Sequence, residues 1–144
     1  MSVEHILNEK GREVITANQT STVLEIAKIL AEKRIGAVLI VNEEGATQGI
    51  VSERDIVREI SINGFNAMDM RADKIMTTNV HTARVEDSEI ELMALMTQCR
   101  IRHVPVVHEG RLAGMVSIGD VVKQRIREIE REAAEMKAYI TTSY

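Results

Sequence analysis

The sequence predicts an α+β fold of two β-α-β-β-α repeats, packed sheet to sheet about a pseudo-twofold axis, with an extended C-terminal helix. The stretch Gly49–Asp55 recurs as Gly114–Asp120. With Val14 aligned to Val80 and one deletion after Glu109, 15 of 46 aligned pairs are identical, against roughly three by chance. Each copy also orders its helical and strand periodicities in the same way. Because one such unit exposes an apolar sheet face, we expect the two to pack together.

The first repeat contains a helix predicted from Val23 to about Arg34. Thr22 precedes apolar residues at helical spacing, and Glu25 follows it by three residues, as in a capping box. Continuous β-branched runs predict buried strands, and Asn and Gly predict turns. The other expected elements are a short strand around Val14–Thr16, a strand at Ala37–Val41, a turn at Asn42–Gly45, a strand at Gln48–Val51 and a helix at Ser52–Ile60.

The second repeat predicts the same order. Its elements are a short strand around Val80–Thr82, a helix capped by Asp87 or Ser88, a strand at Val104–Val107, a turn at His108–Gly110, a strand at Leu112–Val116 and a helix from about Ile118. Pro105 favours an edge or a bulge in its strand, since proline has no N–H to donate. The expected boundaries are residues 1–64 for the first repeat with its lead-in, 65–127 for the second, and 128–144 for a C-terminal helical extension.

The C-terminal helix carries an apolar seam with alternating spacings of four and three residues. Its members are Val122, Ile126, Ile129, Ala133, Met136 and Ile140. This spacing is typical of a coiled coil, and the opposite face is charged. We therefore expect the seam to pack on another subunit or back on its own domain.

Composition excludes several classes of function. The 18 basic and 22 acidic residues are interspersed and give a net charge of −4, which argues against a nucleic-acid surface. No stretch is long and apolar enough to span a membrane, so a soluble, cytoplasmic protein is expected. The four histidines lack metal-ligand spacing, and no metal site is predicted. The lone Cys99, beside Arg100, is either a small buried hydrophobe or a reactive thiol.

The two Gly-hydrophobic-x-Ser-x-x-Asp motifs, each after a strand pair and before a helix, resemble the cystathionine β-synthase (CBS) domain. Ile75-Met-Thr77 before the second copy is also typical, and the resemblance covers Asn8 to about Arg127. It implies a tandem pair, or Bateman module, that is not an enzyme and binds AMP-like ligands, ADP, ATP or NAD between its repeats. It also implies homodimers or larger homo-oligomers through helices, and an unidentified regulated protein. A structural dimerisation module without ligand and an enzyme acting through Cys99 are the alternatives.

By the same resemblance, each cleft combines the Ser and Asp of one repeat with residues of the other. The first cleft would contain Ser52, Arg54, Asp55, Thr77, His81, Ile101, Arg102 and His103. The second would contain Ser117, Asp120, Ile15, Ile35, Gly36 and Ala37. A carboxylate in the first helical turn suits ribose hydroxyls, while a serine hydroxyl and free amides suit phosphate. Helix capping alone also explains Ser-x-x-Asp.

The two predicted clefts differ in positive charge. Where the first has Arg54 and Arg102, the second has Gly119 and Gly36. Guanidinium groups are strong donors to phosphate. The sequence therefore predicts that the first cleft holds the phosphorylated end of a ligand more tightly, unless Arg102 is only an exposed surface charge.

Overall fold

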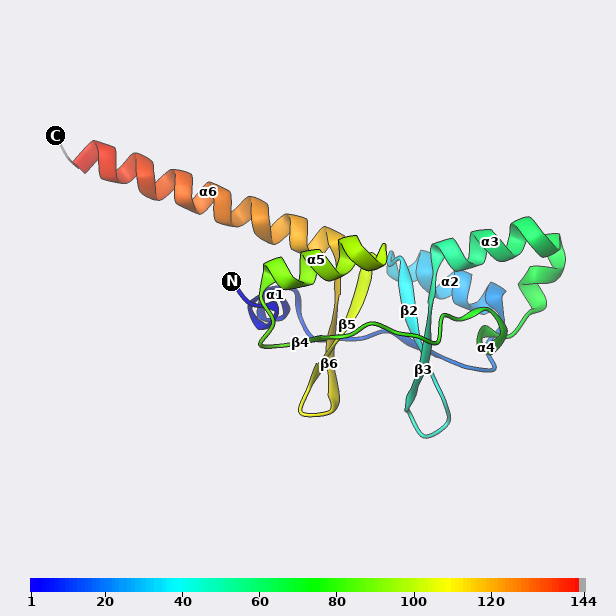
Figure 1. The fold of residues 1–144 in the computed structure, drawn as a ribbon. Coiled ribbons are helices and arrows are strands. Elements are labelled where there is room, and N and C mark those ends of the chain that lie inside the picture. Colours follow the sequence, from blue (N-terminus) through cyan, green and yellow to red (C-terminus); the bar gives the residue numbers. More distant parts are fainter. Residues whose placement is uncertain (143–144) are drawn as a thin grey trace. The chain divides into compact units, whose positions relative to one another are not determined.

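The computed structural model describes residues 1–142 and confirms the α+β class, the two repeats and the C-terminal helix. Each repeat contains a three-stranded sheet, ordered β1-β2-β3 in the first and β4-β5-β6 in the second (Figure 1). The elements are α1 (Val3–Lys10), β1 (Thr16–Asn18), α2 (Val23–Lys33), β2 (Ala37–Val41), β3 (Thr47–Ser52), α3 (Glu53–Asn63), the 3-10 helix η1 (Gly64–Asp69), α4 (Ala72–Ile75), β4 (Ala83–Arg84), α5 (Glu89–Cys99), β5 (His103–His108), β6 (Arg111–Ser117) and α6 (Ile118–Thr142). In both sheets the first pairing is parallel and the second antiparallel.

The helices α2 and α5 begin and end in the same way. The N-cap hydroxyl of Thr22 accepts a hydrogen bond from the Glu25 N–H at 3.2 Å. Ser88, not Asp87, is the N-cap of α5. At their C-termini both helices end at an arginine in the left-handed conformation, Arg34 and Arg100, a position that glycine occupies more often. The shared ending places the first residue of the next strand at the same point in each repeat.

Of the two alternatives predicted for Pro105, the edge is absent, because β5 is the central strand of its sheet. The register shift expected there is present, between Val106 and Val107, but the first repeat has one at the equivalent place without proline. In the first repeat the N–H of Leu39 donates to the Ile15 carbonyl at 3.4 Å. Pro105, which aligns with Leu39, has no N–H, and the parallel neighbour β4 has two residues where β1 has three.

The short first strands also lie later than predicted. The sequence placed them around Val14–Thr16 and Val80–Thr82, whereas β1 covers Thr16–Asn18 and β4 covers Ala83–Arg84. The start of each short strand is determined by its parallel partner, because pairing begins with Thr16 opposite Leu39 in the first repeat and with Ala83 opposite Val106 in the second. β-Branched composition marks a tendency to extend, but the neighbouring strand determines where pairing starts.

The chain forms two compact units that do not follow its linear order. One contains residues 13–81, and the other contains residues 1–12 with 82–142 of the described chain. Val3, Ile6 and Leu7 of α1 are therefore buried in the core of the second repeat. The segment between the repeats instead contributes Ala72 and Ile75 to the core of the first. The expected boundaries at residues 64 and 127 divide the sequence into its repeats. In the fold, the segment that precedes each repeat, its lead-in, packs in the core of the other repeat.

The long helix α6 packs by its first part only. Val121 and Gln124 are buried, whereas each described residue from Ile129 to Thr141 is exposed. The expected extension therefore continues α6 itself, and its last two residues, 143 and 144, lie outside the described part. Within residues 1–142, the helices are too short or too polar to cross a membrane.

Candidate functional site

The first Ser-Asp pair lies where β3 ends and α3 begins. Ser52 is the N-cap of α3 and forms a complete capping box with Asp55. The Ser52 N–H donates to Asp55 Oδ2 at 2.9 Å, and the Asp55 N–H donates to Ser52 Oγ at 3.3 Å. Asp55 is 5% exposed, and its other oxygen, Oδ1, accepts from Arg58 Nη2 at 2.6 Å. The carboxylate is thus neutralised by a guanidinium from the next turn of the same helix.

The second pair repeats this geometry between β6 and α6. The Ser117 N–H donates to Asp120 Oδ2 at 2.8 Å, and the Asp120 N–H donates to Ser117 Oγ at 3.2 Å. The countercharge, however, comes from a distant segment. Lys10, the last residue of α1, donates from Nζ to Asp120 Oδ2 at 2.7 Å and to the Met115 carbonyl at 2.6 Å. The two carboxylates therefore have the same capping geometry, but the cation that neutralises each one comes from a different place in the chain.

Charge and burial act in opposite directions on Asp120. Burial, the largest single influence, raises the pKa of its carboxyl group, while hydrogen bonds from Lys10 and Ser117 lower it. Together the lowering influences prevail, and the pKa of Asp120 lies below its usual value. The group is ionised at neutral pH and held by a lysine that a ligand would have to displace or share.

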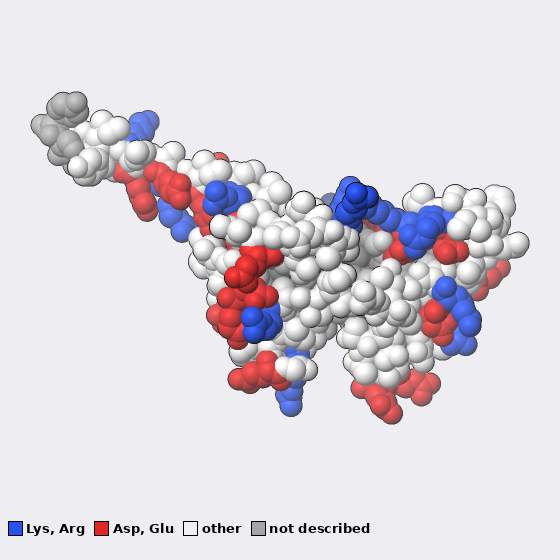
Figure 2. Space-filling model, viewed as in Figure 1, with Lys and Arg blue, Asp and Glu red and all other residues white. Residues whose placement is uncertain are grey.

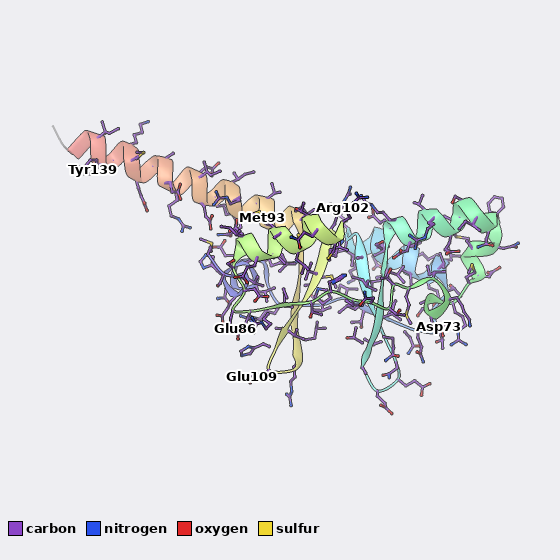
Figure 3. The ribbon with its side chains drawn as sticks, in the orientation of Figure 1. Asp73, Glu86, Met93, Arg102, Glu109 and Tyr139 are labelled. Carbon is purple, nitrogen blue, oxygen red and sulfur yellow. The ribbon has the colours of Figure 1, made fainter. Side chains whose placement is uncertain are left out.

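Backbone pairing brings further predicted site residues to each Ser-Asp pair. In the first repeat, Ala37 lies opposite Ser52 and the Glu53 N–H donates to the Gly36 carbonyl at 2.9 Å. In the second, His103 lies opposite Ser117 and the Ile118 N–H donates to the Arg102 carbonyl at 2.8 Å. Arg102 is exposed where α5 leads into β5 (Figure 3). The backbone of Ser52 is thus paired with residues that the sequence assigned to the second cleft, and that of Ser117 with residues assigned to the first. Each repeat forms a half-site of its own, at the edge where one strand ends and a helix starts.

The other predicted residues are placed as follows. Thr77 is paired through its backbone with Ile50 of β3 and is exposed. Arg54 is exposed in the first turn of α3. Ile15, Ile35, His81 and Ile101 are half-buried. Thr77 and His81 belong to the compact unit that contains Ser52, while Ile101 belongs to the other. The assignment of these residues to two clefts stays a prediction.

Two residues near the carboxylates were missed by the sequence reasoning. Arg58 follows Asp55 by three positions in a helix, so its spacing was a usable signal. Lys10 is 110 residues from Asp120 and gave no signal. With Lys123, Arg127, Glu9 and Asp120 it lines a hollow of about 100 Å³ between α1 and α6. Both missed residues are cations that hold the carboxylates.

The chemistry of the half-sites suits recognition of polyols and anions. Each offers a carboxylate acceptor, a serine hydroxyl and the positive end of a helix dipole. The described residues contain no group of three or more histidine, cysteine, aspartate or glutamate side chains arranged to hold a metal ion. Cys99 is a half-buried thiol at the end of α5. Both basic and acidic side chains are present on the face seen in Figure 2.

A family model for the CBS domain matches this sequence twice, over residues 3–62 and 72–127. The mitochondrial CBS domain-containing protein CBSX3 of Arabidopsis thaliana is 32% identical over 151 aligned residues, which cover 99% of this chain and 73% of that protein. These matches span both Ser-Asp pairs.

Solved structures show the same architecture. The CBS-domain protein ATU1752 from Agrobacterium tumefaciens is 40% identical with a TM-score of 0.85, covering 86% of this chain and 92% of that one. A CBS domain pair of the protein MJ0100, solved in complex with 5′-methylthioadenosine and S-adenosyl-L-methionine, is 29% identical with a TM-score of 0.78. That alignment covers 89% of this chain and 98% of the MJ0100 pair.

Proposed function

Because this chain belongs to the CBS-domain family, we propose that it is a non-enzymatic regulatory module that binds adenosine-containing ligands. The observation that carries this proposal is the pair of Ser-Asp half-sites with matching cap geometry in both repeats. The MJ0100 pair, which holds two adenosine derivatives, supports the ligand class.

In the proposed complex, Asp55 and Asp120 accept hydrogen bonds from ribose hydroxyls. Ser52 and Ser117, with the second amides of α3 and α6 (those of Arg54 and Gly119), donate to phosphate or to another polar end of the ligand. The ribose must exchange with Arg58 at the first carboxylate and with Lys10 at the second. A displaced cation remains near the site, where it balances the charge of a phosphate.

We propose AMP-like ligands first, with ADP, ATP or NAD next; the MJ0100 complex adds sulfur-containing adenosines to the class to be tested. We propose that Arg54 strengthens phosphate binding at the Ser52 half-site. The sequence also assigned Arg102 to that cleft, whereas its carbonyl accepts from the Ile118 N–H beside Ser117, so its guanidinium is proposed as a second phosphate donor whose cleft is to be tested. Both arginines are exposed, which leaves their guanidinium groups accessible. Replacing Arg54 with Ala is expected to weaken the binding of AMP more than the binding of adenosine.

A ligand regulates only through its different affinity for two arrangements of the protein. We propose that the output passes to another cytoplasmic protein or to self-association of this chain through its helices. The second candidate is a structural dimerisation module without ligand. It is favoured by one observation, namely that both carboxylates already have intrachain cations and Asp55 is buried.

Titration calorimetry with AMP, ATP, NAD and S-adenosylmethionine tests the proposal. Binding heat is expected for the native protein and is expected to fall in Ser52→Ala and Ser117→Ala. Ser88→Ala is the matched control, because Ser88 caps α5 with the same geometry but is not followed by an aspartate. No heat with any of the four ligands would favour the structural module. Mass spectrometry of nucleotide released from the denatured, purified protein gives an independent identification.

A further inference from the structure

The apolar seam of α6 faces away from the unit that carries the helix. Its residues are exposed in the single chain: Val122 by 50%, Ile126 by 51%, Ile129 by 55%, Met136 by 70% and Ile140 by 57%. The face that packs on the second repeat is a different one, formed by Val121 and Gln124. The expected alternative that the seam folds back on its own domain is therefore not what this structure shows.

The second half of α6 extends beyond the helices α1 and α5, which contact the same helix (Figure 1). Tyr139 is labelled near its far end (Figure 3). The seam from Val122 to Ile140 is about 27 Å long at 1.5 Å per residue. Helices in water gain most of their stability from packing an apolar face. A seam of this length on a single exposed helix therefore indicates that another helix covers it.

We propose that the seam pairs with α6 of a second copy of this chain, as a parallel, in-register, two-stranded coiled coil. The spacings of four and three residues place the seam residues at the two core positions of a heptad. Ala133 lies near the middle of the seam, where its small side chain lets two helices approach closely. This inference is independent of ligand binding and extends the proposed function by naming one partner.

The charges beside the seam select the parallel orientation. In a parallel pair, a residue on one flank faces the residue five positions later on the other helix. Glu132 then faces the partner's Lys137, and Arg125 faces the partner's Glu130, so both contacts join opposite charges. The Glu132 contact is the cleaner of the two, since Arg125 also has intrachain ion pairs with Glu128 and Glu89.

The opposite orientation would join like charges. In an antiparallel pair with full overlap, each flank faces the same flank of the other helix. Lys123 would then lie opposite the partner's Lys137, and Glu130 opposite the partner's Glu130. Like charges at such positions destabilise a coiled coil. The complementary charges therefore favour a second copy of α6 in parallel register over an unspecific apolar contact.

Two adjacent alanines provide a matched test of the seam. Ala133 lies in it and Ala134 beside it, and both are exposed in the single chain, so neither change disturbs the core of the unit. Sedimentation equilibrium on the full protein without nucleotide is expected to show dimers for the native chain. Ala133→Glu is expected to raise the dimer dissociation constant about tenfold or more, because a coiled-coil core excludes unpaired charge. Ala134→Glu is expected to leave it unchanged.

A charge exchange tests the orientation. Glu132→Lys alone and Lys137→Glu alone each create like-charge contacts between parallel copies and are expected to weaken the dimer about threefold. An equal mixture of these two variants is expected to regain native affinity, because each chain then supplies the charge that the other lacks. An unchanged affinity in both single variants, or no recovery in the mixture, would overturn the proposal.

Disulfide trapping gives a second measure of register. In a Cys99→Ser background, Ile140→Cys is expected to cross-link two chains under mild oxidation, since parallel register places the two positions side by side. Thr141→Cys, one residue off the seam, is the control. A native protein that is monomeric or trimeric, or an Ile140→Cys variant that does not cross-link, contradicts a parallel pair. A dimer that Ala133→Glu leaves intact shows that other surfaces hold it, and also contradicts the proposal.

Discussion

Replacing Lys10 with methionine removes the cation that holds Asp120 while keeping the length and apolar stem of the side chain. Lys10 Nζ makes two short hydrogen bonds, to Asp120 Oδ2 and to the Met115 carbonyl. Val3, Ile6 and Leu7 anchor α1 in the core of the second repeat, so the helix itself is expected to stay in place. Lys10→Met then measures the contact between the end of α1 and the start of α6.

The expected loss of unfolding free energy is about 1 kcal/mol at neutral pH. A solvent-exposed ion pair contributes up to about 1 kcal/mol, and a hydrogen bond to a charged group contributes about 1.5–3 kcal/mol. The side chains of Lys10 and Asp120 are 33% and 23% exposed, so solvent screens part of the interaction. For a chain of this size, 1 kcal/mol corresponds to a fall in Tm of about 3 °C.

The loss depends on pH in a direction that follows from Asp120. Its folded pKa is lowered, since the hydrogen bonds from Lys10 and Ser117 outweigh burial, the largest single influence. A carboxyl group with a lowered folded pKa stabilises the fold above its unfolded pKa and loses that contribution as pH falls through the folded value. The difference between native protein and Lys10→Met is therefore expected to be full at pH 7 and to fall in acid to what the Met115 hydrogen bond and the helix C-terminus contribute.

Lys33→Met is the matched control for this experiment. Lys33 is also the last residue of its helix, α2, so both substitutions remove the same favourable charge from a helix C-terminus. Lys33 is exposed, and urea unfolding of both variants from pH 3 to pH 8 isolates the contact with Asp120. Equal losses in the two variants, or a Lys10→Met loss that does not change with pH, would refute the reasoning.

Three further predictions concern packing, capping and a buried acid. Gly49→Ala is expected to lower the free energy of unfolding by about 1–3 kcal/mol, and by more than Gly114→Ala does, as measured by urea unfolding. A Cβ at Gly49 would lie 2.7 Å from the Thr77 carbonyl oxygen, whereas a Cβ at Gly114 would meet the end of the Leu7 side chain, which can move. Ser52→Ala is expected to cost about 1 kcal/mol and more than Ser88→Ala by the same measurement, since Ser52 Oγ also donates to Asp55; equal costs would contradict this. Burial, and then the neighbouring Glu128, raise the pKa of Glu89, so its ionised form opposes folding above its unfolded pKa. Glu89→Gln is expected to raise Tm at pH 8 and to have little effect near pH 4, and a gain that is independent of pH would count against this.

Local signals in the sequence predicted most of the secondary structure. The boundaries of α2 followed from Thr22 and the apolar spacing after it, and the helix predicted at Ser52–Ile60 is present as α3. These features depend on residues within one or two helical turns of each other. The short strands β1 and β4 were displaced because their limits depend on a partner strand distant in sequence. For Pro105 an edge and a bulge both stayed open, because proline statistics do not say which strand lies on each side of its own.

The candidate site was predictable in its caps and not in its countercharges. Ser52, Asp55, Ser117 and Asp120 form the expected hydrogen bonds because each pair lies within one helical turn. Lys10 reaches Asp120 only because the lead-in segment packs on the second repeat. The periodicity within a repeat does not predict that the segment before the first repeat packs on the second. The contact between Lys10 and Asp120 is therefore the part of the site that sequence patterns could not predict.

The origin of the two countercharges gives the two half-sites different consequences. At Asp55 the cation is Arg58 in the same helix, so a ribose that displaces it changes a local contact on α3. At Asp120 the cation is Lys10, so the same displacement releases the end of α1 from the start of α6. Since α6 carries the exposed seam, a ligand that displaced Lys10 from Asp120 would act on the segment that leads directly into the seam. Under the proposed function, two half-sites with the same motif would therefore be coupled differently to the rest of the fold, and the second would have the shorter route to self-association.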